Sequence, residues 1–249
     1  MFSISSLFKK SPAASAFESL KVDMHSHLIP GIDDGSPDVA SSIALLRGLK
    51  QLGFSKIITT PHVYRDLYPN DSQGIRAGMK VLTDAMESEG IELQVEAAAE
   101  YYVDRHFEQL IESNDILSFG KERYVLIEMS FVSISPAIEE VVFSLVARGY
   151  SPILAHPERY NYLAGNLSFY QRLAEMGCVL QVNVLSLMGH YGKSAQHWAN
   201  TLVKSGLVAF LGTDLHHAQH LSLLTKYQYS RRIADVIANY PFKNRELLG

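Results

Sequence analysis

The sequence has one cysteine, Cys178, and one tryptophan among 249 residues. A single cysteine excludes an intramolecular disulfide and is typical of proteins kept in a reducing compartment such as the cytoplasm. No segment approaches the roughly 20 consecutive apolar residues that span a bilayer. We therefore expect a cytoplasmic protein with no transmembrane segment.

Positive charge is also in short supply. The chain carries 22 lysines and arginines against 26 aspartates and glutamates, for a net charge of −4. This balance argues against the broad basic surface of a nucleic-acid-binding protein. With 47% hydrophobic and 19% charged residues, the chain has the composition of a globular protein with a large core.

Residues 1–20 show no strong pattern, and we expect them to form a flexible tail. The start, MFSISSLFKK, places its basic pair after the apolar stretch, which is the reverse of a secretory signal. A weak amphipathic membrane contact through Phe2, Leu7 and Phe8 is the alternative. Residues 21–249 contain no linker or low-complexity segment, which favours a single domain.

Short apolar runs alternate with amphipathic stretches throughout this domain. The expected strands are residues 21–25, 56–60, 93–99, 124–128, 152–156, 179–183 and 208–213. Helix-like stretches lie between them, such as residues 38–53 and 136–149, and glycine closes five of them: Gly53, Gly90, Gly149, Gly177 and Gly206. Seven strand–helix units predict an α/β fold with a parallel sheet, closed as a distorted (β/α)7 TIM-like barrel. An open doubly wound sheet is the alternative. Residues 226–249 are expected to form a final amphipathic helix and a tail that pack against the domain.

Polar side chains that can bind metals end most of these strands. They follow one another at intervals of about 27 to 38 positions: His25, His62, Glu100, Glu128, His156, Asn183 and Asp214. Since the carboxyl ends of barrel strands meet on one face, we expect these residues to share a pocket.

Two of these positions belong to pairs spaced two apart, His25 with His27 and Asp214 with His216. On a strand such pairs point to the same side and can bind one cation. Glu128 ends a hydrophobic run, and a buried carboxylate needs a cation nearby. An ion-pair network with lysine or arginine is the structural alternative.

Together these residues give eight candidate ligands, with Asp33 or Asp34 as a ninth: His25, His27, His62, Glu100, Glu128, His156, Asp214 and His216. One zinc ion needs only four ligands, so the set predicts two or three divalent cations. Mixed nitrogen and oxygen donors suit manganese, iron or zinc. Clusters of this kind are typical of phosphate hydrolysis.

Arg159, three residues after His156, is the candidate for a bidentate phosphate clamp. A salt bridge to Glu158 is its structural alternative, and Arg65 and Lys121 are weaker candidates for the same role. Cysteine-based phosphate chemistry is excluded, since it requires an arginine six residues after the cysteine, where Val184 stands.

The motifs HSHLIPGIDDG, TTPH, AAEYY, LIEMS, AHPERY and GTDLHH, in this order from residue 21 onward, resemble the bacterial capsule-type protein-tyrosine phosphatases. This CpsB/CapC/YwqE group belongs to the PHP (polymerase and histidinol phosphatase) superfamily. The resemblance implies the PHP-type barrel, a trinuclear site that prefers Mn²⁺, and hydrolysis of phosphotyrosine by a metal-bound hydroxide.

The resemblance also implies roles for particular residues. Arg159, Asp34 and His62 would be catalytic, and Arg159 would hold the phosphate. The implied partner is the phosphotyrosine tail of a membrane-associated bacterial tyrosine kinase that controls polysaccharide export, which would place this chain at the inner face of the membrane. The family resemblance is also compatible with a homo-oligomer. The implied metal ligands are His25, His27, Asp34, His62, Glu100, Glu128, His156, Asp214 and His216.

One departure from the family concerns the phosphate. Many relatives carry an arginine shortly after the Asp-x-His pair, whereas here none occurs before Arg231. His217 or His220 is the candidate to replace this arginine. Besides Arg159, the expected phosphate contacts are His217 and Arg65.

Other function classes remain open from the sequence. A phosphatase for a small metabolite, such as histidinol phosphate, would use the same metal chemistry. A metal-dependent exonuclease fits poorly with the acidic balance. An amidohydrolase would often use a strand-end lysine where Glu128 stands, and a silent regulatory module would not need the complete ligand set.

Overall fold

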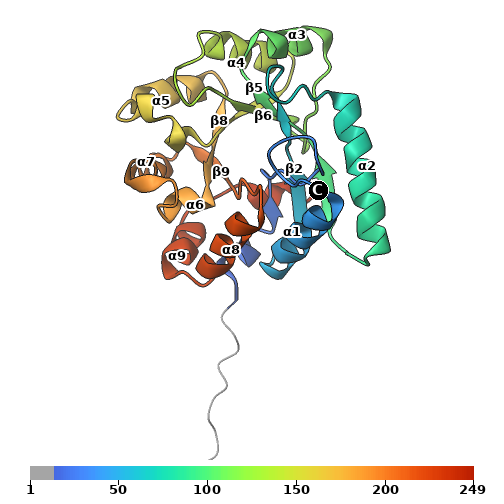
Figure 1. Ribbon diagram of the computed structural model, residues 1–249. Helices are drawn as coiled ribbons and strands as arrows, with labels where there is room; N and C mark the ends of the chain where they lie inside the picture. The colour runs from blue at the N-terminus through green and yellow to red at the C-terminus, as the bar shows by residue number, and fades with distance from the viewer. Residues whose placement is uncertain (1–13) are drawn as a thin grey trace, which may run out of the picture.

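The computed structural model describes residues 14–249, in which strands and helices alternate as the sequence predicts. The strands lie at the centre and the helices surround them (Figure 1). The strands are β1 (Val22–Asp23), β2 (Lys56–Thr59), β3 (His62–Val63), β4 (Gln94–Ala97), β5 (Glu100–Tyr102), β6 (Tyr124–Glu128), β7 (Ser151–Ala155), β8 (Val179–Asn183) and β9 (Val208–Gly212). The helices are α1 (Val39–Gln51), α2 (Ser72–Ser88), α3 (Arg105–Ser113), α4 (Ile138–Ala147), α5 (Leu167–Glu175), α6 (Val184–Leu187), α7 (Gly192–Lys204), α8 (Ala218–Tyr227) and α9 (Arg231–Asn239).

The strands close into a barrel. All named strand pairs are parallel, in the orders β1-β2-β4 and β3-β5-β6-β7-β8-β9. The two ladders are continuous, because the chain runs from β2 into β3 and from β4 into β5. Across these breaks the Ala98 amide donates to the Thr59 carbonyl at 2.9 Å and the Glu100 amide to the Pro61 carbonyl at 3.0 Å. A bridge between Ser26 and Leu215 connects the first strand to the last. The distorted (β/α)7 barrel is therefore confirmed, and the open sheet is wrong.

Two of the expected strands are interrupted before the residues that were expected to end them. His62 begins β3 and Glu100 begins β5, each after a two-residue break that follows β2 or β4. Pro61 lies in the first break, and proline has no N–H to donate to a ladder. These two residues therefore lie within longer, bent barrel strands, not at strand ends.

Side-chain alternation along a strand directs polar groups into the barrel. In β6, Val125 and Ile127 pack in the layer between the strands and the helices, while Leu126 packs in the interior cluster. Since residues two apart share a side, Glu128 continues the inner side of β6 and reaches the carboxyl end of the barrel.

Glycine ends five of the helices as expected. Gly53, Gly90, Gly149, Gly177 and Gly206 have φ between +62° and +99° and each follows its helix by two residues. This left-handed conformation is the common helix stop that only glycine adopts without steric cost.

The C-terminal segment packs against the amino ends of the strands, as the sequence predicts. A 3-10 helix (Asn244–Leu248) follows α9. It is attached to the start of β2, because the Lys56 ammonium group donates to the Leu247 carbonyl at 2.8 Å. Asn244 is fully buried there and bonds to the backbone of Val22 and Leu211. In Figure 1 the C-terminus correspondingly lies beside β2.

Residues 16–20 of the segment expected to be a flexible tail are ordered and packed against the domain. Ala16–Ser19 form a 3-10 helix, and Phe17 is fully buried and stacked on Phe54 with 5.8 Å between ring centroids. Burial of this aromatic ring explains why the segment is ordered. The suggested membrane-contact residues Phe2, Leu7 and Phe8 lie outside the described residues.

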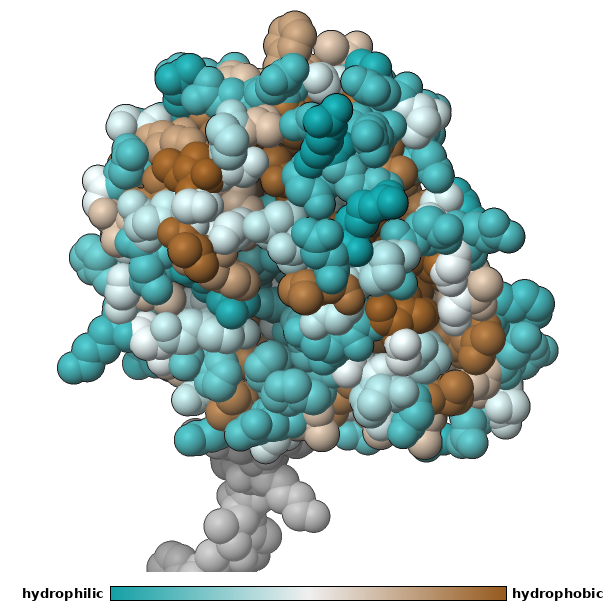
Figure 2. Space-filling model, turned by 45° about the horizontal axis from the view of Figure 1, so that its top comes forward, coloured by the Kyte–Doolittle hydropathy of each residue, from teal (hydrophilic) through white to brown (hydrophobic). Residues whose placement is uncertain are grey.

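Figure 2 shows one face, on which hydrophobic side chains occur in small separate groups among hydrophilic ones. Within residues 14–249, no helix combines the length and apolar character needed to cross a membrane.

Candidate metal centre

The carboxyl face of the barrel gathers all nine expected ligands into one network of short contacts. The contacts form three overlapping groups, and within each group the nitrogen and oxygen atoms lie within 4.8 Å of one another. The groups are His27, Asp34, His62 and His216; His25, His27 and Glu100; and His62, Glu100 and Glu128. His156 joins through Glu100 at 3.0 Å, and Asp214 through His25 at 3.4 Å.

Glu100 lies at the centre of this network. Its Oε2 is 3.1 Å from His25 Nε2, 3.4 Å from His27 Nε2 and 3.2 Å from His62 Nδ1. Its Oε1 lies 3.0 Å from His156 Nε2. One carboxylate thus contacts imidazoles from four barrel positions.

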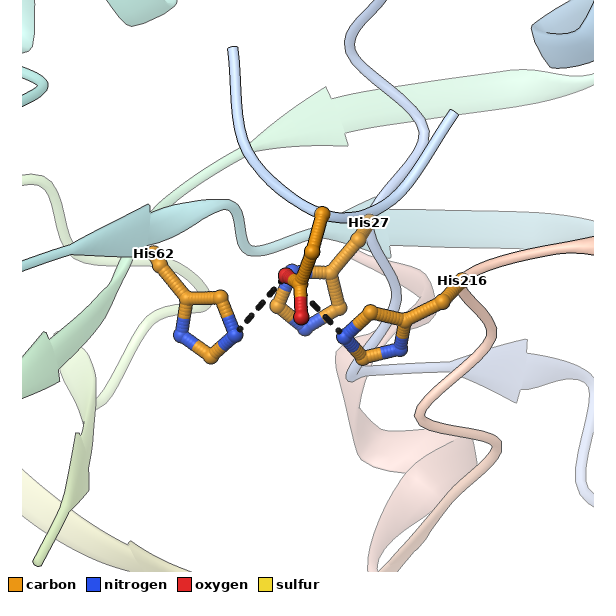
Figure 3. Close-up of side chains that lie close together, drawn as sticks. His27, His62 and His216 are labelled. Carbon is orange, nitrogen blue, oxygen red and sulfur yellow. Dashed lines mark ion pairs between the residues drawn. The ribbon is translucent and has the colours of Figure 1, made fainter. Parts of the chain in front are cut away.

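Asp34 completes the solvent side of the network. Its Oδ1 lies 3.4 Å from His62 Nε2 and 3.6 Å from His216 Nε2. Figure 3 shows the rings of His27, His62 and His216 pointing toward one another from three separate segments of the chain. Half of the Asp34 side chain, 52%, remains exposed, so this group borders the solvent.

The turn after His27 places the two neighbouring aspartates differently. Asp33 Oδ2 accepts from His27 Nδ1 at 2.8 Å and from the His62 amide at 3.1 Å. This bond holds the His27 ring with Nε2 directed at the network. Gly35 permits the turn, since a Cβ there would lie 2.3 Å from the His27 carbonyl oxygen.

Two ligand candidates have unusual backbone conformations. His156 has φ +33° and Asp214 has φ +52°, a region that side chains other than glycine rarely occupy. His156 directly follows the end of β7, and Asp214 lies two residues after the end of β9. Such strain is typical of functional sites, where it fixes the direction of a side chain.

The acidic groups attract positive charge into the site. Burial lowers the pKa of His25, but the charges of Glu100 and Asp214 outweigh it and raise that pKa to about 10. For His62, burial is likewise outweighed, chiefly by Glu100, and the pKa rises to about 10. The carboxylates therefore need cationic partners, which protons on histidine or bound divalent cations can supply.

One close donor pair of the network lacks hydrogen-bond geometry. His62 Nδ1 is buried and lies 3.0 Å from Glu128 Oε1, yet it has no properly aligned hydrogen-bond partner among the described residues. Donors that converge without hydrogen-bond geometry are typical of a metal site. The mixture of imidazole and carboxylate groups suits Mn, Fe or Zn.

A pocket of about 250 Å³ opens over this network. Arg159 lines it and donates from Nη1 to Asp214 Oδ2 at 3.1 Å, which excludes the alternative salt bridge to Glu158 as its main contact. His217 and His220 also line the pocket, beside His216. Three of the expected phosphate-binding candidates are thus at the site.

The two remaining candidates are not. Arg65 is exposed, lies outside the pocket lining, and has its Nη1 3.5 Å from His106 Nδ1. Lys121 lies in the turn before β6, at the amino end of that strand and on the opposite face of the barrel. Spacing along the sequence did not reveal which end of a barrel strand a loop residue occupies.

Cys178 takes no part in the site. Its thiol is buried, and burial raises its pKa to about 12. A protonated, inaccessible thiol is no nucleophile, which agrees with the absence of a cysteine–arginine loop.

Sequence reasoning missed Gln181 on β8, and it placed Asn183 at the pocket without assigning it a partner. His25 Nδ1 donates to Gln181 Oε1 at 2.8 Å, so His25 Nε2 faces the network. Gln181 Nε2 donates to Asn183 Oδ1, and Asn183 Nδ2 donates to Asp214 Oδ2 at 2.7 Å. These bonds connect ligand candidates from the two ends of the chain. The two-residue spacing in VLQVN placed both side chains on one strand face, but it did not indicate their partners.

Comparison with known proteins places this site in a family. The model of the family described as "Capsular polysaccharide synthesis, CpsB/CapC" matches residues 21–225. The chain belongs to this family. Among CpsB/CapC relatives, the tyrosine-protein phosphatase YwqE of Bacillus subtilis is 30% identical over 230 residues, covering 91% of each protein. The tyrosine-protein phosphatase CpsB of Streptococcus pneumoniae is 25% identical over 222 residues, 87% of this chain and 89% of that protein.

Solved structures agree with the CpsB/CapC assignment. A chain from the crystal structures of YwqE from B. subtilis and CpsB from S. pneumoniae, described as unique metal-dependent tyrosine phosphatases, superposes with a TM-score of 0.77 and 28% identity. It covers 91% of this chain and 94% of that one. An amidohydrolase from Mycoplasma synoviae, 13% identical with a TM-score of 0.56, covers 94% of this chain and 88% of its own and shares the fold.

Proposed function

We propose that this CpsB/CapC protein is a metal-dependent protein-tyrosine phosphatase, a hydrolase of phosphoric monoesters. The observation that carries the proposal is a network of nine imidazole and carboxylate donors beneath a pocket that Arg159 lines. The relatives YwqE and CpsB, both named tyrosine-protein phosphatases, support it.

The nine donors are proposed to hold two or three divalent cations, with Mn²⁺ the preferred ion. Glu100, which contacts four histidines, would be among the residues that hold the cations. Such cations polarise phosphoryl oxygens and lower the pKa of water, which is the chemistry that ester hydrolysis needs at neutral pH. The chain's own task is to present the donors in a fixed arrangement.

Arg159 is proposed to bind the phosphate. Its guanidinium group lies between the rings of Phe131 and Tyr191, 4.6 Å and 4.4 Å from their centroids. This packing holds a planar donor pair at the pocket, which suits two phosphate oxygens. His217, at the pocket edge, is proposed to supply the contact that an arginine makes in many relatives. The position of Arg65 gives it no such role.

The leaving phenolate needs a proton or a positive charge. Asp34 has 52% of its side chain exposed, compared with 8% or less for Glu100, Glu128 and Asp214. Asp34 is therefore the carboxylate of this set that lies nearest to solvent, and it is proposed to position the solvent molecule that protonates the leaving group. His62, 3.4 Å from Asp34, is proposed to orient it.

The proposed substrate is the phosphotyrosine of a membrane-associated tyrosine kinase that controls capsule or exopolysaccharide synthesis. The family description, which names capsular polysaccharide synthesis, supports this choice. The proposal places the chain in the cytoplasm, at the inner face of the membrane.

Metal analysis of the purified chain, paired with a phosphotyrosine-peptide assay, tests the proposal. Activity should disappear after exhaustive chelation and return with Mn²⁺, whereas iodoacetamide should leave it unchanged because Cys178 is buried. An alkyl phosphate such as histidinol phosphate serves as the comparison. Faster turnover of that compound would favour the small-metabolite alternative, and activity that survives chelation would exclude the metal chemistry.

A further inference from the structure

The mouth of the pocket has an aromatic wall on one side. Phe131 lines the pocket together with Tyr191, and the Arg159 guanidinium lies between their rings. The Phe131 ring also stacks near His156, with 5.5 Å between centroids. An apolar ring therefore borders both the proposed phosphate clamp and a proposed metal ligand.

Phe131 is exposed although it is large and apolar. Its exposed fraction is 47%, while most phenylalanines of the domain are buried. It lies in the loop between β6 and α4, whose neighbouring residues Val132 and Ile134 are also exposed, at 84% and 41%. Exposure of such a ring costs free energy of folding, so a bound group that covers it would recover that energy.

The loop that carries Phe131 is held in place. The Tyr162 hydroxyl donates to the Ser130 carbonyl at 2.8 Å, and the Met129 amide donates to the Tyr160 hydroxyl at 3.0 Å. Further along, the Ser135 hydroxyl donates to the Val103 carbonyl at 3.2 Å. The ring is thus presented by an anchored segment, and little ordering is needed when a ligand covers it.

The position of the phosphate fixes where the rest of the substrate must lie. With the phosphate held in the pocket by Arg159, beside the donor network, the group on the ester oxygen extends toward the pocket mouth and Phe131. Two aromatic rings attract each other by offset or edge-to-face packing in addition to burying area. An alkyl chain has no such interaction and covers less of the ring.

We propose that Phe131 is a specificity-determining residue that selects aryl over alkyl phosphate monoesters. The proposal rests on the proposed function for the location of the phosphate. It goes further because it assigns contact with the substrate ring to Phe131. In this role Phe131 acts on the substrate directly, and not only by supporting Arg159.

Binding of two non-hydrolysable probes tests the proposal without relying on turnover. Phenylphosphonate and methylphosphonate are titrated calorimetrically into the full-length, Mn²⁺-loaded protein. We expect phenylphosphonate to bind roughly three- to tenfold more tightly. Phe131→Ala should remove most of this difference while leaving methylphosphonate binding within about twofold, and Phe131→Tyr should preserve it.

The matched control is Val132→Ala, which alters the adjacent, more exposed apolar residue outside the pocket lining. It should leave both affinities unchanged. Equal losses for both probes in Phe131→Ala would assign the ring to support of Arg159 and overturn the proposal. An unchanged ratio would overturn it as well.

The proposed function is judged separately, by hydrolysis of phenyl phosphate and glycerol phosphate by the wild-type chain. A wild type that hydrolyses neither compound refutes the phosphatase proposal, while the ratio of phosphonate affinities still decides the role of Phe131. In an active enzyme, kcat/KM for phenyl phosphate should fall with Phe131→Ala and that for glycerol phosphate should not.

Discussion

At the scale of single residues, the site depends on carboxylates that contact several imidazoles at once. Glu100 is fully buried, and its two oxygens lie within 3.4 Å of nitrogens from four histidines. A group in this position organises the whole site, because each neighbour takes its orientation from the same carboxylate.

Replacing Glu100 therefore tests its proposed role as a metal ligand. Glu100→Gln keeps the shape but removes the charge, so the protein should lose bound metal and kcat/KM should fall about 100-fold or more. Metal content per chain and phosphotyrosine-peptide hydrolysis are the measurements. Glu92→Gln, at an exposed position, is the control. Full metal content in Glu100→Gln would show that this carboxylate does not bind the cations.

Gln181 contacts the candidate ligand His25 directly and reaches Asp214 only through Asn183. The bond from His25 Nδ1 to Gln181 fixes the ring so that Nε2 is free for a cation. Gln181→Ala should raise the Mn²⁺ concentration for half-maximal activity by about 10- to 100-fold, with kcat largely restored at saturating Mn²⁺. Gln94→Ala, at an exposed position, should have no effect. A lowered kcat with unchanged metal dependence would contradict this positioning role.

At the scale of elements, a tight turn and two broken strands give the site its shape. The turn after His27 brings Asp33 and Asp34 to different sides of the network. The breaks after β2 and β4 let His62 and Glu100 enter the pocket from within the barrel wall. None of these features is visible in the hydrophobic pattern, because each depends on how the backbone bends.

The turn can be tested at Gly35. In Gly35→Ala the added Cβ would lie 2.3 Å from the His27 carbonyl oxygen and 2.4 Å from its Cβ, so the turn must move. We expect metal content to fall and activity to drop more than tenfold, while far-UV circular dichroism stays unchanged.

The control for the turn is Gly74→Ala in the first turn of α2, where the nearest atom is Asp71 Oδ1 at 3.2 Å. Alanine in a helix should change stability by no more than about 1 kcal/mol and leave activity intact. Normal metal binding in Gly35→Ala would mean that the turn tolerates displacement.

At the scale of the whole molecule, the barrel is fastened at the end opposite the pocket. Asn244 accepts from the Leu211 amide and donates to the carbonyls of Val22 and Leu211, at 2.7 to 3.0 Å. It thereby connects the C-terminal segment to the first and last strands, where the barrel closes.

Asn244→Ala should therefore destabilise the protein by about 2–4 kcal/mol, because three buried hydrogen bonds are lost and their partners stay buried. Urea denaturation of the Mn²⁺-loaded protein measures the change. Asn239→Ala, at the exposed end of α9, should stay within about 0.5 kcal/mol of the wild type. A comparably small effect for Asn244→Ala would show that the barrel does not depend on this fastening.

Much of the protein followed from the sequence alone. The alternation of apolar runs and amphipathic stretches determined the parallel α/β architecture, since parallel strands must be buried on both faces and helices must cover them. Closure into a barrel was settled by the bridge between Ser26 and Leu215. The recurrence of His, Glu and Asp near the strand ends determined which residues meet, because a barrel brings all carboxyl ends to one face.

Only the tertiary structure decided the direction and partner of each side chain. It separated Arg159 from Arg65 and Lys121, gave Asp33 and Asp34 different neighbours, and connected Gln181 and Asn183 to the ligands. The reason is physical. The type and spacing of residues fix their chemistry and approximate level in a barrel, whereas side-chain direction depends on turn geometry and on packing between segments far apart in the chain.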